Sequence, residues 1–98
     1  MSDDHNQAPL KDAINKFMQI YKLDKKYNQV EVRNAWNAAM GEYIVKRTRS
    51  IYLSDSVLRV RLESSVIKEE ILYAKTKVMQ DLNTKIGRDL IEDILFIE

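Results

Sequence analysis

Apolar residues recur every three or four positions in the first part of the chain, which predicts an amphipathic helix. The apolar positions are Leu10, Ala13, Ile14, Phe17, Met18 and Tyr21. Pro9 fits the first position of this helix, where its missing N–H leaves no hydrogen bond unmade. Because Met1–Gln7 offers little apolar surface to bury, we expect a mobile tail before residue 8.

A second helix follows a polar connector at Lys22–Lys26. Asn28 and Glu31 have the spacing of a capping box, so the helix is expected to begin there. Its apolar face consists of Val32, Ala35, Trp36, Ala39 and Met40. Gly41 either stops this helix or lets a short second helix, Tyr43–Arg47, turn off at an angle.

The pattern then changes to one typical of a β-hairpin, with strands at 51–53 and 58–62 around a turn at Asp55–Ser56. A two- or four-residue loop sets Leu53 opposite Leu58, which joins apolar side chains on one face.

The same register places Tyr52 beside Arg59 and Ser50 beside Arg61 on the opposite face. A three-residue loop would instead set Ile51 opposite Arg59 and mix the two faces. We therefore prefer the first register.

A long helix is predicted after the hairpin, capped by Ser64 or Ser65 and stopped at Gly87. One apolar side continues for about 20 residues, or about 30 Å of helix. Its members are Ile67, Ile71, Val78, Leu82 and Ile86, widened by Leu72 and Met79. Ile91–Ile97 is rich in β-branched and aromatic residues and predicts a third strand.

The predicted element order is α-α-β-β-α-β, an α+β fold with helices packed on one face of a three-stranded sheet. Residues 8–98 are expected to form one domain, with a small core and little room for a buried catalytic cavity. The other face of the sheet would stay open to solvent or a partner.

Charge is unevenly distributed although the net charge is only +1. The segment from residue 46 to 61 holds five bases and one acid, Asp55. The bases are Lys46, Arg47, Arg49, Arg59 and Arg61. A local positive field of this kind attracts phosphate; the alternative is an ordinary solvated rim.

Two aromatic residues have a functional and a structural interpretation. Tyr52 could stack on an unpaired base, with Arg59 adding a cation–π contact. A cross-strand Tyr–Arg pair also stabilises sheets, and we favour this structural role for Tyr52. Trp36 lies on the apolar stripe and is expected in the core rather than in a partner contact.

Catalysis, cofactors and membrane insertion are not expected. The chain has no cysteine, which excludes thiolate zinc sites, disulfides and a cysteine nucleophile. His5 lies near Asp3 and Asp4, but a mobile tail does not hold metal ligands in fixed geometry. No nucleotide-binding or hydrolase motif is present. No apolar run approaches the roughly 20 residues that span a bilayer, and we expect a cytoplasmic protein.

Taken together, the order and spacing of these residues resemble the DciA-like family, over roughly Leu10 to Phe96. The residues that carry the resemblance are Trp36, Met40-Gly41, Ile44, Thr48-Arg49, Leu53-Ser54-Asp55, Leu58-Arg59-Val60, Ser64-Ser65, Glu70-Ile71-Leu72, Leu82-Asn83, Gly87, Ile94 and Phe96. The family usually has glycine in the hairpin turn, where this chain has Ser56. The resemblance implies a fold like that of the K-homology (KH) domain, DNA binding, and loading or operation of the bacterial replicative helicase.

A KH module clamps nucleic acid with a Gly-x-x-Gly loop. The two glycines of this chain lie 46 positions apart, so sequence-specific readout of the KH kind is not expected. The leading hypothesis is a non-enzymatic module that binds nucleic acid, DNA in preference to RNA.

The competing hypothesis is a protein-interaction adaptor. Ile94–Ile97 offers apolar side chains to both faces, which suits a strand buried on both sides or an edge strand that pairs with another chain. The second case would give a homodimer through the last strand.

Overall fold

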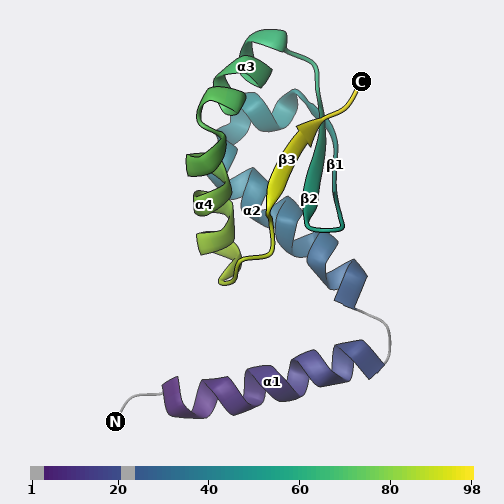
Figure 1. Ribbon diagram of the computed structural model, residues 1–98, viewed down its shortest axis with the longest axis vertical. Coiled ribbons are helices and arrows are strands. Elements are labelled where there is room, and N and C mark those ends of the chain that lie inside the picture. The colour runs from purple at the N-terminus through teal and green to yellow at the C-terminus, as the bar shows by residue number, and fades with distance from the viewer. Residues whose placement is uncertain (1–3, 21–23) are drawn as a thin grey trace.

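The computed structural model describes residues 4–20 and 24–98 and has an α+β architecture (Figure 1). Its elements are α1 (Asp4–Ile20), α2 (Asp24–Lys46), β1 (Thr48–Ser54), β2 (Val57–Leu62), α3 (Ser65–Tyr73), α4 (Lys75–Ile86) and β3 (Asp93–Phe96). The observed order is α-α-β-β-α-α-β, which confirms the predicted fold class and splits one predicted helix into two. No helix in the described ranges is both long and apolar enough to cross a membrane.

The sheet has the strand order β1-β2-β3. β1 and β2 form an antiparallel hairpin, and β3 lies beside β2 in parallel orientation. Asp55 and Ser56 form the two-residue turn with φ of 51° and 64°, the backbone of a tight hairpin. Leu53 pairs with Leu58, so the predicted register is confirmed.

The core lies between one face of the sheet and α2, α3 and α4 (Figure 1). Its buried members are Val32, Ala35, Trp36, Leu58, Val60, Leu62, Ile67, Ile71, Val78, Leu82, Ile91 and Ile94. The helices leave the second face of the sheet uncovered. The predicted packing of helices on one face is confirmed for α2, α3 and α4, and so is the position of Trp36 in the core.

α1 differs from the prediction in its start and in its packing. It begins at Asp4, so the predicted start at Pro9 is wrong; residues 1–3 of the predicted tail lie outside the described residues. Pro9 lies inside the helix and removes one backbone hydrogen bond from it. α1 lies apart from the sheet (Figure 1), and Leu10 and Ile14 on its apolar stripe are exposed.

α2 begins at Asp24, four residues before the predicted capping box. Asn28 and Glu31 instead bind Arg88, in the loop that follows α4. Gly41 has φ of 79° and ψ of 167°, outside helical geometry, so the helix kinks there and residues 42–46 continue in a new direction. The second of the two roles predicted for Gly41 is therefore the observed one.

The predicted long helix is two helices that meet at Ala74 (φ −101°, ψ 19°). Ile71 and Val78 are both buried on either side of the break. Because they are seven residues apart, close to two helical turns, the apolar spacing is the same for one helix or two. Ser64 caps α3, since its Oγ accepts from the N–H of Ile67 at 3.2 Å.

Gly87 ends α4 as predicted. Its left-handed φ of 92° is the conformation that a helix C-terminus requires and glycine adopts without strain. Asn83 then shapes the following loop: its side chain accepts from the N–H groups of Leu90 and Ile91 and donates to the carbonyl of Ile91.

β3 is shorter than the predicted strand and lies at an edge of the sheet. Ile94 is fully buried while Leu95 is 42% exposed, so a strand buried on both sides is excluded. The N–H of Ile94 donates to the Asp93 carboxylate at 2.8 Å. This bond occupies one backbone donor near the start of the strand.

Candidate nucleic-acid interface

The five predicted basic residues lie on the end of α2 and on the two hairpin strands. Lys46 is the last residue of α2, and Arg47 follows it. Arg49 lies in β1 at an irregularity in the pairing, and Arg59 and Arg61 lie in β2. The N–H of Glu63, just past β2, donates to the carbonyl of Arg47 at 3.0 Å, so the helix end and the end of β2 are adjacent.

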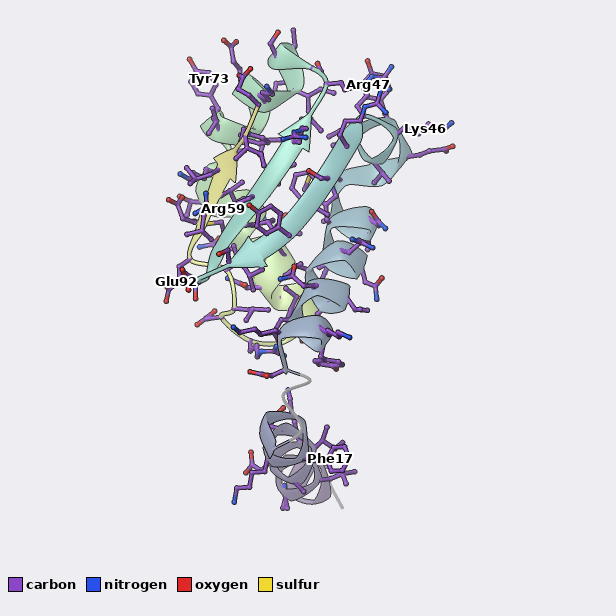
Figure 2. All side chains as sticks on the ribbon, turned by 90° about the vertical axis from the view of Figure 1, so that its right-hand side faces the viewer. Phe17, Lys46, Arg47, Arg59, Tyr73 and Glu92 are labelled. Carbon is purple, nitrogen blue, oxygen red and sulfur yellow. The ribbon has the colours of Figure 1, made fainter. Side chains whose placement is uncertain are left out.

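The end of α2 holds Arg47 in a defined position. Its guanidinium carbon lies 3.6 Å from the centroid of the Tyr43 ring, and its Nη1 donates to the Tyr43 carbonyl at 3.0 Å. A guanidinium over an aromatic face is a cation–π contact. Figure 2 shows Arg47 and Lys46 side by side at this end of the molecule.

Two of the five bases are paired with acids that flank the basic segment. Lys46 Nζ lies 3.0 Å from a Glu42 carboxylate oxygen, and Arg49 contacts the Glu63 carboxylate through Nε and Nη2. All four side chains are well exposed, so each pair is weak and accessible to water. The positive field is therefore smaller than the count of bases suggests.

The open face of the sheet carries a continuous cross-strand row. Tyr52 pairs with Arg59, and Arg59 pairs with Leu95, so the three side chains lie side by side across β1, β2 and β3. Tyr52 is 43% exposed and Leu95 is 42% exposed. Arg61 lies two residues farther along β2, on the same face, opposite Ser50. The predicted neighbours of both arginines are confirmed.

Neither Arg59 nor Arg61 forms an ion pair with any acid in residues 9–17 and 24–98, the ranges whose side chains the structure describes. Their Cα atoms are about 7 Å apart, two strand residues. Arg47, Arg59 and Arg61 are thus three cations without a carboxylate partner in these ranges. They extend from the end of α2 onto the open face of the sheet. A surface that combines exposed cations with an aromatic ring is suited to single-stranded nucleic acid, because the cations contact phosphates and the ring stacks on a base.

Tyr43 is a candidate contact that the sequence interpretation missed. It is 64% exposed and stacks on Arg47. The signal was present, since Tyr43 and Arg47 are four residues apart and would share one side of the short helix predicted over Tyr43–Arg47. Glu42 and Glu63 were also missed as partners, because both lie just outside the segment in which charges were counted.

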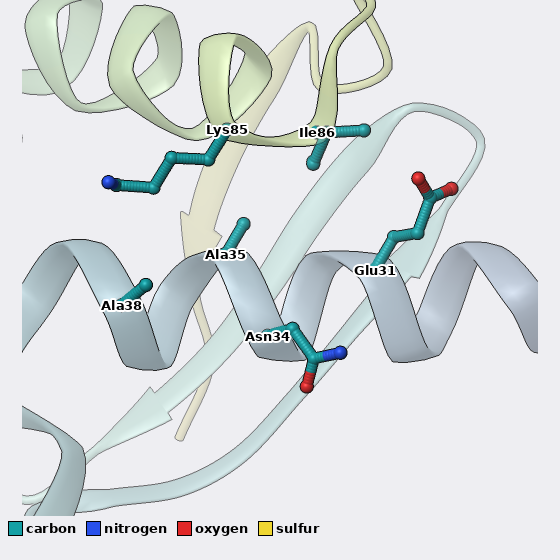
Figure 3. Close-up of a pocket in the computed structure, with 6 residues that line it drawn as sticks. All are labelled: Glu31, Asn34, Ala35, Ala38, Lys85 and Ile86. Atoms are coloured by element: carbon teal, nitrogen blue, oxygen red, sulfur yellow. The ribbon is translucent and has the colours of Figure 1, made fainter.

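A pocket elsewhere on the molecule lies between α2 and α4 (Figure 3). Its lining residues are Glu31, Asn34, Ala35, Ala38, Lys85 and Ile86. In Figure 3 the side chains of Glu31 and Lys85 lie at opposite ends of the pocket, and their charged groups point away from each other. Glu31 is already bound to Arg88, so the pocket has no convergent polar groups to orient a ligand, and the open face remains the better candidate.

Comparison with known families finds a match to the family described as Dna[CI] antecedent, DciA, over residues 9–96. Comparison with curated proteins and with solved structures gives no match. The match covers nearly the whole chain, including the kinked helix, the hairpin and the edge strand. The chain therefore belongs to the DciA family, the family of replicative-helicase loaders.

Proposed function

We propose that the chain is a non-enzymatic nucleic-acid-binding module of helicase loading, and that it contacts DNA through the open face of its sheet. The observation that supports this most directly is the row Tyr52–Arg59–Leu95 with Arg61 beside it, uncovered by helices. The arginines are free of carboxylate partners within the described residues. A role in replication favours DNA over RNA and a cytoplasmic location, and the element order is compatible with a KH-like fold.

The proposed contact is mainly electrostatic. Three cations, Arg47, Arg59 and Arg61, would reach phosphates, while Tyr52 would stack on a base. Neutralising about three phosphates on a single strand gives a slope of about −2 in log affinity against log salt concentration. Binding should therefore be strong only at low salt and show little sequence preference.

The experiment compares two double variants by fluorescence anisotropy. Arg59→Ala with Arg61→Ala should weaken binding to a labelled single strand of about 20 nucleotides by about tenfold or more at low salt. The matched control, Lys46→Ala with Arg49→Ala, removes the same charge from acid-paired residues and should weaken binding less. Unchanged affinity for the single strand in Arg59→Ala with Arg61→Ala, at an unchanged thermal unfolding temperature, would contradict the proposal.

The same titrations with duplex DNA and with RNA identify the preferred nucleic acid. A stacking contact to Tyr52 requires an unpaired base. Tyr52→Ala should therefore reduce affinity for the single strand more than affinity for the duplex. Equal losses would assign Tyr52 to sheet stabilisation, the alternative role of a cross-strand Tyr–Arg pair.

A second proposed function is homodimerisation through β3. It is favoured by the edge position of the strand and by the exposure of Leu95, because an unpaired edge can add a strand from another chain. Light scattering after size exclusion at two concentrations tests this. A strict monomer at high concentration would exclude the dimer.

A further inference from the structure

α3 presents to solvent a helix side that is apolar at both ends and acidic in the middle. We call it the α3 acidic face, and it consists of Val66, Glu69, Glu70 and Tyr73. These residues are three or four positions apart, so their side chains are neighbours on the helix. The residues that α3 gives to the core, Ile67 and Ile71, lie on another side and are buried.

The apolar residues of this face are unusually exposed. Tyr73 is 94% exposed and Val66 is 65% exposed. Tyr73 is the last residue of α3, directly before the break at Ala74. Figure 2 shows Tyr73 on the opposite side of the molecule from Lys46 and Arg47. Exposed aromatic residues of this kind are the usual anchors of protein–protein interfaces.

The charge of the face defines the partner that fits it. Glu69 and Glu70 form no ion pair within the described part of the chain, whereas Asp81 and Asp93 are paired with Lys77 and Lys75. Two adjacent unpaired carboxylates repel a phosphate backbone. They attract lysine or arginine, and the flanking apolar residues require apolar groups on either side of that positive charge.

We propose that the α3 acidic face docks a segment of the replicative helicase in which basic residues are flanked by apolar ones. This inference rests on the proposed role in helicase loading and names the surface used for it. α3 packs on the core side of the sheet, opposite the open face (Figure 1). The protein would therefore be able to contact the helicase and DNA at the same time.

The test measures binding of the full chain to purified replicative helicase from the same organism by biolayer interferometry. Tyr73→Ala and the charge reversal Glu69→Lys with Glu70→Lys should each raise the Kd by about tenfold or more. Tyr73→Phe should keep most of the affinity. The matched control is Tyr27→Ala, which removes another exposed tyrosine, 44% exposed, from α2 and should leave the Kd unchanged.

Two further measurements separate this inference from the proposed DNA contact. Arg59→Ala with Arg61→Ala should leave helicase binding unchanged, and Tyr73→Ala should leave DNA binding unchanged. The inference would be overturned if Tyr73→Ala and the charge reversal Glu69→Lys with Glu70→Lys both bound the helicase within twofold of the unaltered chain. That result would leave the DNA proposal unaffected. Absence of helicase binding by the unaltered chain at low salt would also overturn it. Loss of DNA binding in folded Tyr73→Ala would contradict the separation of the two surfaces.

Discussion

Arg88 ties the start of α2 to the loop that leads into β3, and its removal should destabilise the fold. Its Nη2 donates to Asn28 Oδ1 at 2.6 Å and lies 2.6 Å from Glu31 Oε1, while its Nη1 donates to Glu31 Oε2 at 3.1 Å. The Glu31 side chain is only 16% exposed, against 35% for Arg88. The carboxylate therefore depends on this arginine more than the arginine depends on the carboxylate.

That asymmetry sets the expected magnitudes. Arg88→Met leaves a largely buried carboxylate without its cation. Breaking a fully buried ion pair lowers the unfolding free energy by about 3–5 kcal/mol. Because Arg88 is partly exposed, we expect a smaller loss here, about 2 kcal/mol. Glu31→Met lets Arg88 turn toward water and should cost about 1 kcal/mol. The double variant should cost less than the two single costs added together, because the two groups interact.

Urea unfolding followed by the fluorescence of Trp36 measures these differences, since Trp36 is the single tryptophan and is fully buried. The control is Lys77→Met, which breaks an exposed pair to Asp81 at 3.1 Å and should cost no more than about 0.5 kcal/mol. Equal costs for Arg88→Met and Glu31→Met, or a cost for Arg88→Met as small as that of the control, would refute the reasoning.

Three further predictions concern the hairpin and its surroundings. Ser56→Gly should raise the unfolding free energy by up to about 1 kcal/mol, because Ser56 has φ of 64° and glycine adopts that conformation without strain; a lower urea midpoint would contradict this. Thr48→Val should cost about 1–2 kcal/mol in the same assay, since it removes the acceptor, at 3.0 Å, of the buried Trp36 indole N–H; no loss would show that the bond is dispensable. The hydrogen bond from Lys75, and to a smaller extent that from the Ile94 N–H, lower the pKa of Asp93. The ionised carboxylate therefore stabilises the fold above the ordinary aspartate pKa, and this contribution is lost as pH falls through the lowered pKa. The difference in unfolding free energy between the unaltered chain and Asp93→Asn should shrink between pH 7 and pH 3, and a constant difference would contradict the lowered pKa.

The hairpin could be predicted from sequence in detail because two independent constraints agree. The apolar pattern fixes which residues face the core, and a two-residue turn fixes the register. The neighbours of Arg59 and Arg61 follow directly from that register. Family membership was likewise predicted from the order and spacing of residues along the chain, and the match over residues 9–96 confirms it.

The pairs made by Arg49 and Arg88 could not be predicted, because they depend on contacts between segments that are distant in sequence. The pair Lys46–Glu42, by contrast, is four residues apart within one helix and could be predicted from sequence. Arg49 meets Glu63 across 14 residues, and Arg88 meets Asn28 across 60. The capping-box spacing of Asn28 and Glu31 was misleading for the same reason: two polar residues on one side of a helix can serve a distant arginine as well as a helix start. The local sequence pattern predicts each helix and strand. The contacts between side chains of different elements depend on how those elements pack together, and the pattern does not predict them.

The basic end of α2 is positioned by the core rather than by the surface. The helix kinks at Gly41, and residues 42–46 then lead into β1, the first strand of the hairpin. The buried indole of Trp36 then donates to Thr48 Oγ1 at 3.0 Å, and that hydroxyl donates to the Ile44 carbonyl at 2.9 Å. This chain of two hydrogen bonds links α2 on both sides of the kink to the first residue of β1. Arg47 lies between the linked residues Ile44 and Thr48, so its position relative to the open face is fixed by the same bonds that satisfy the buried tryptophan.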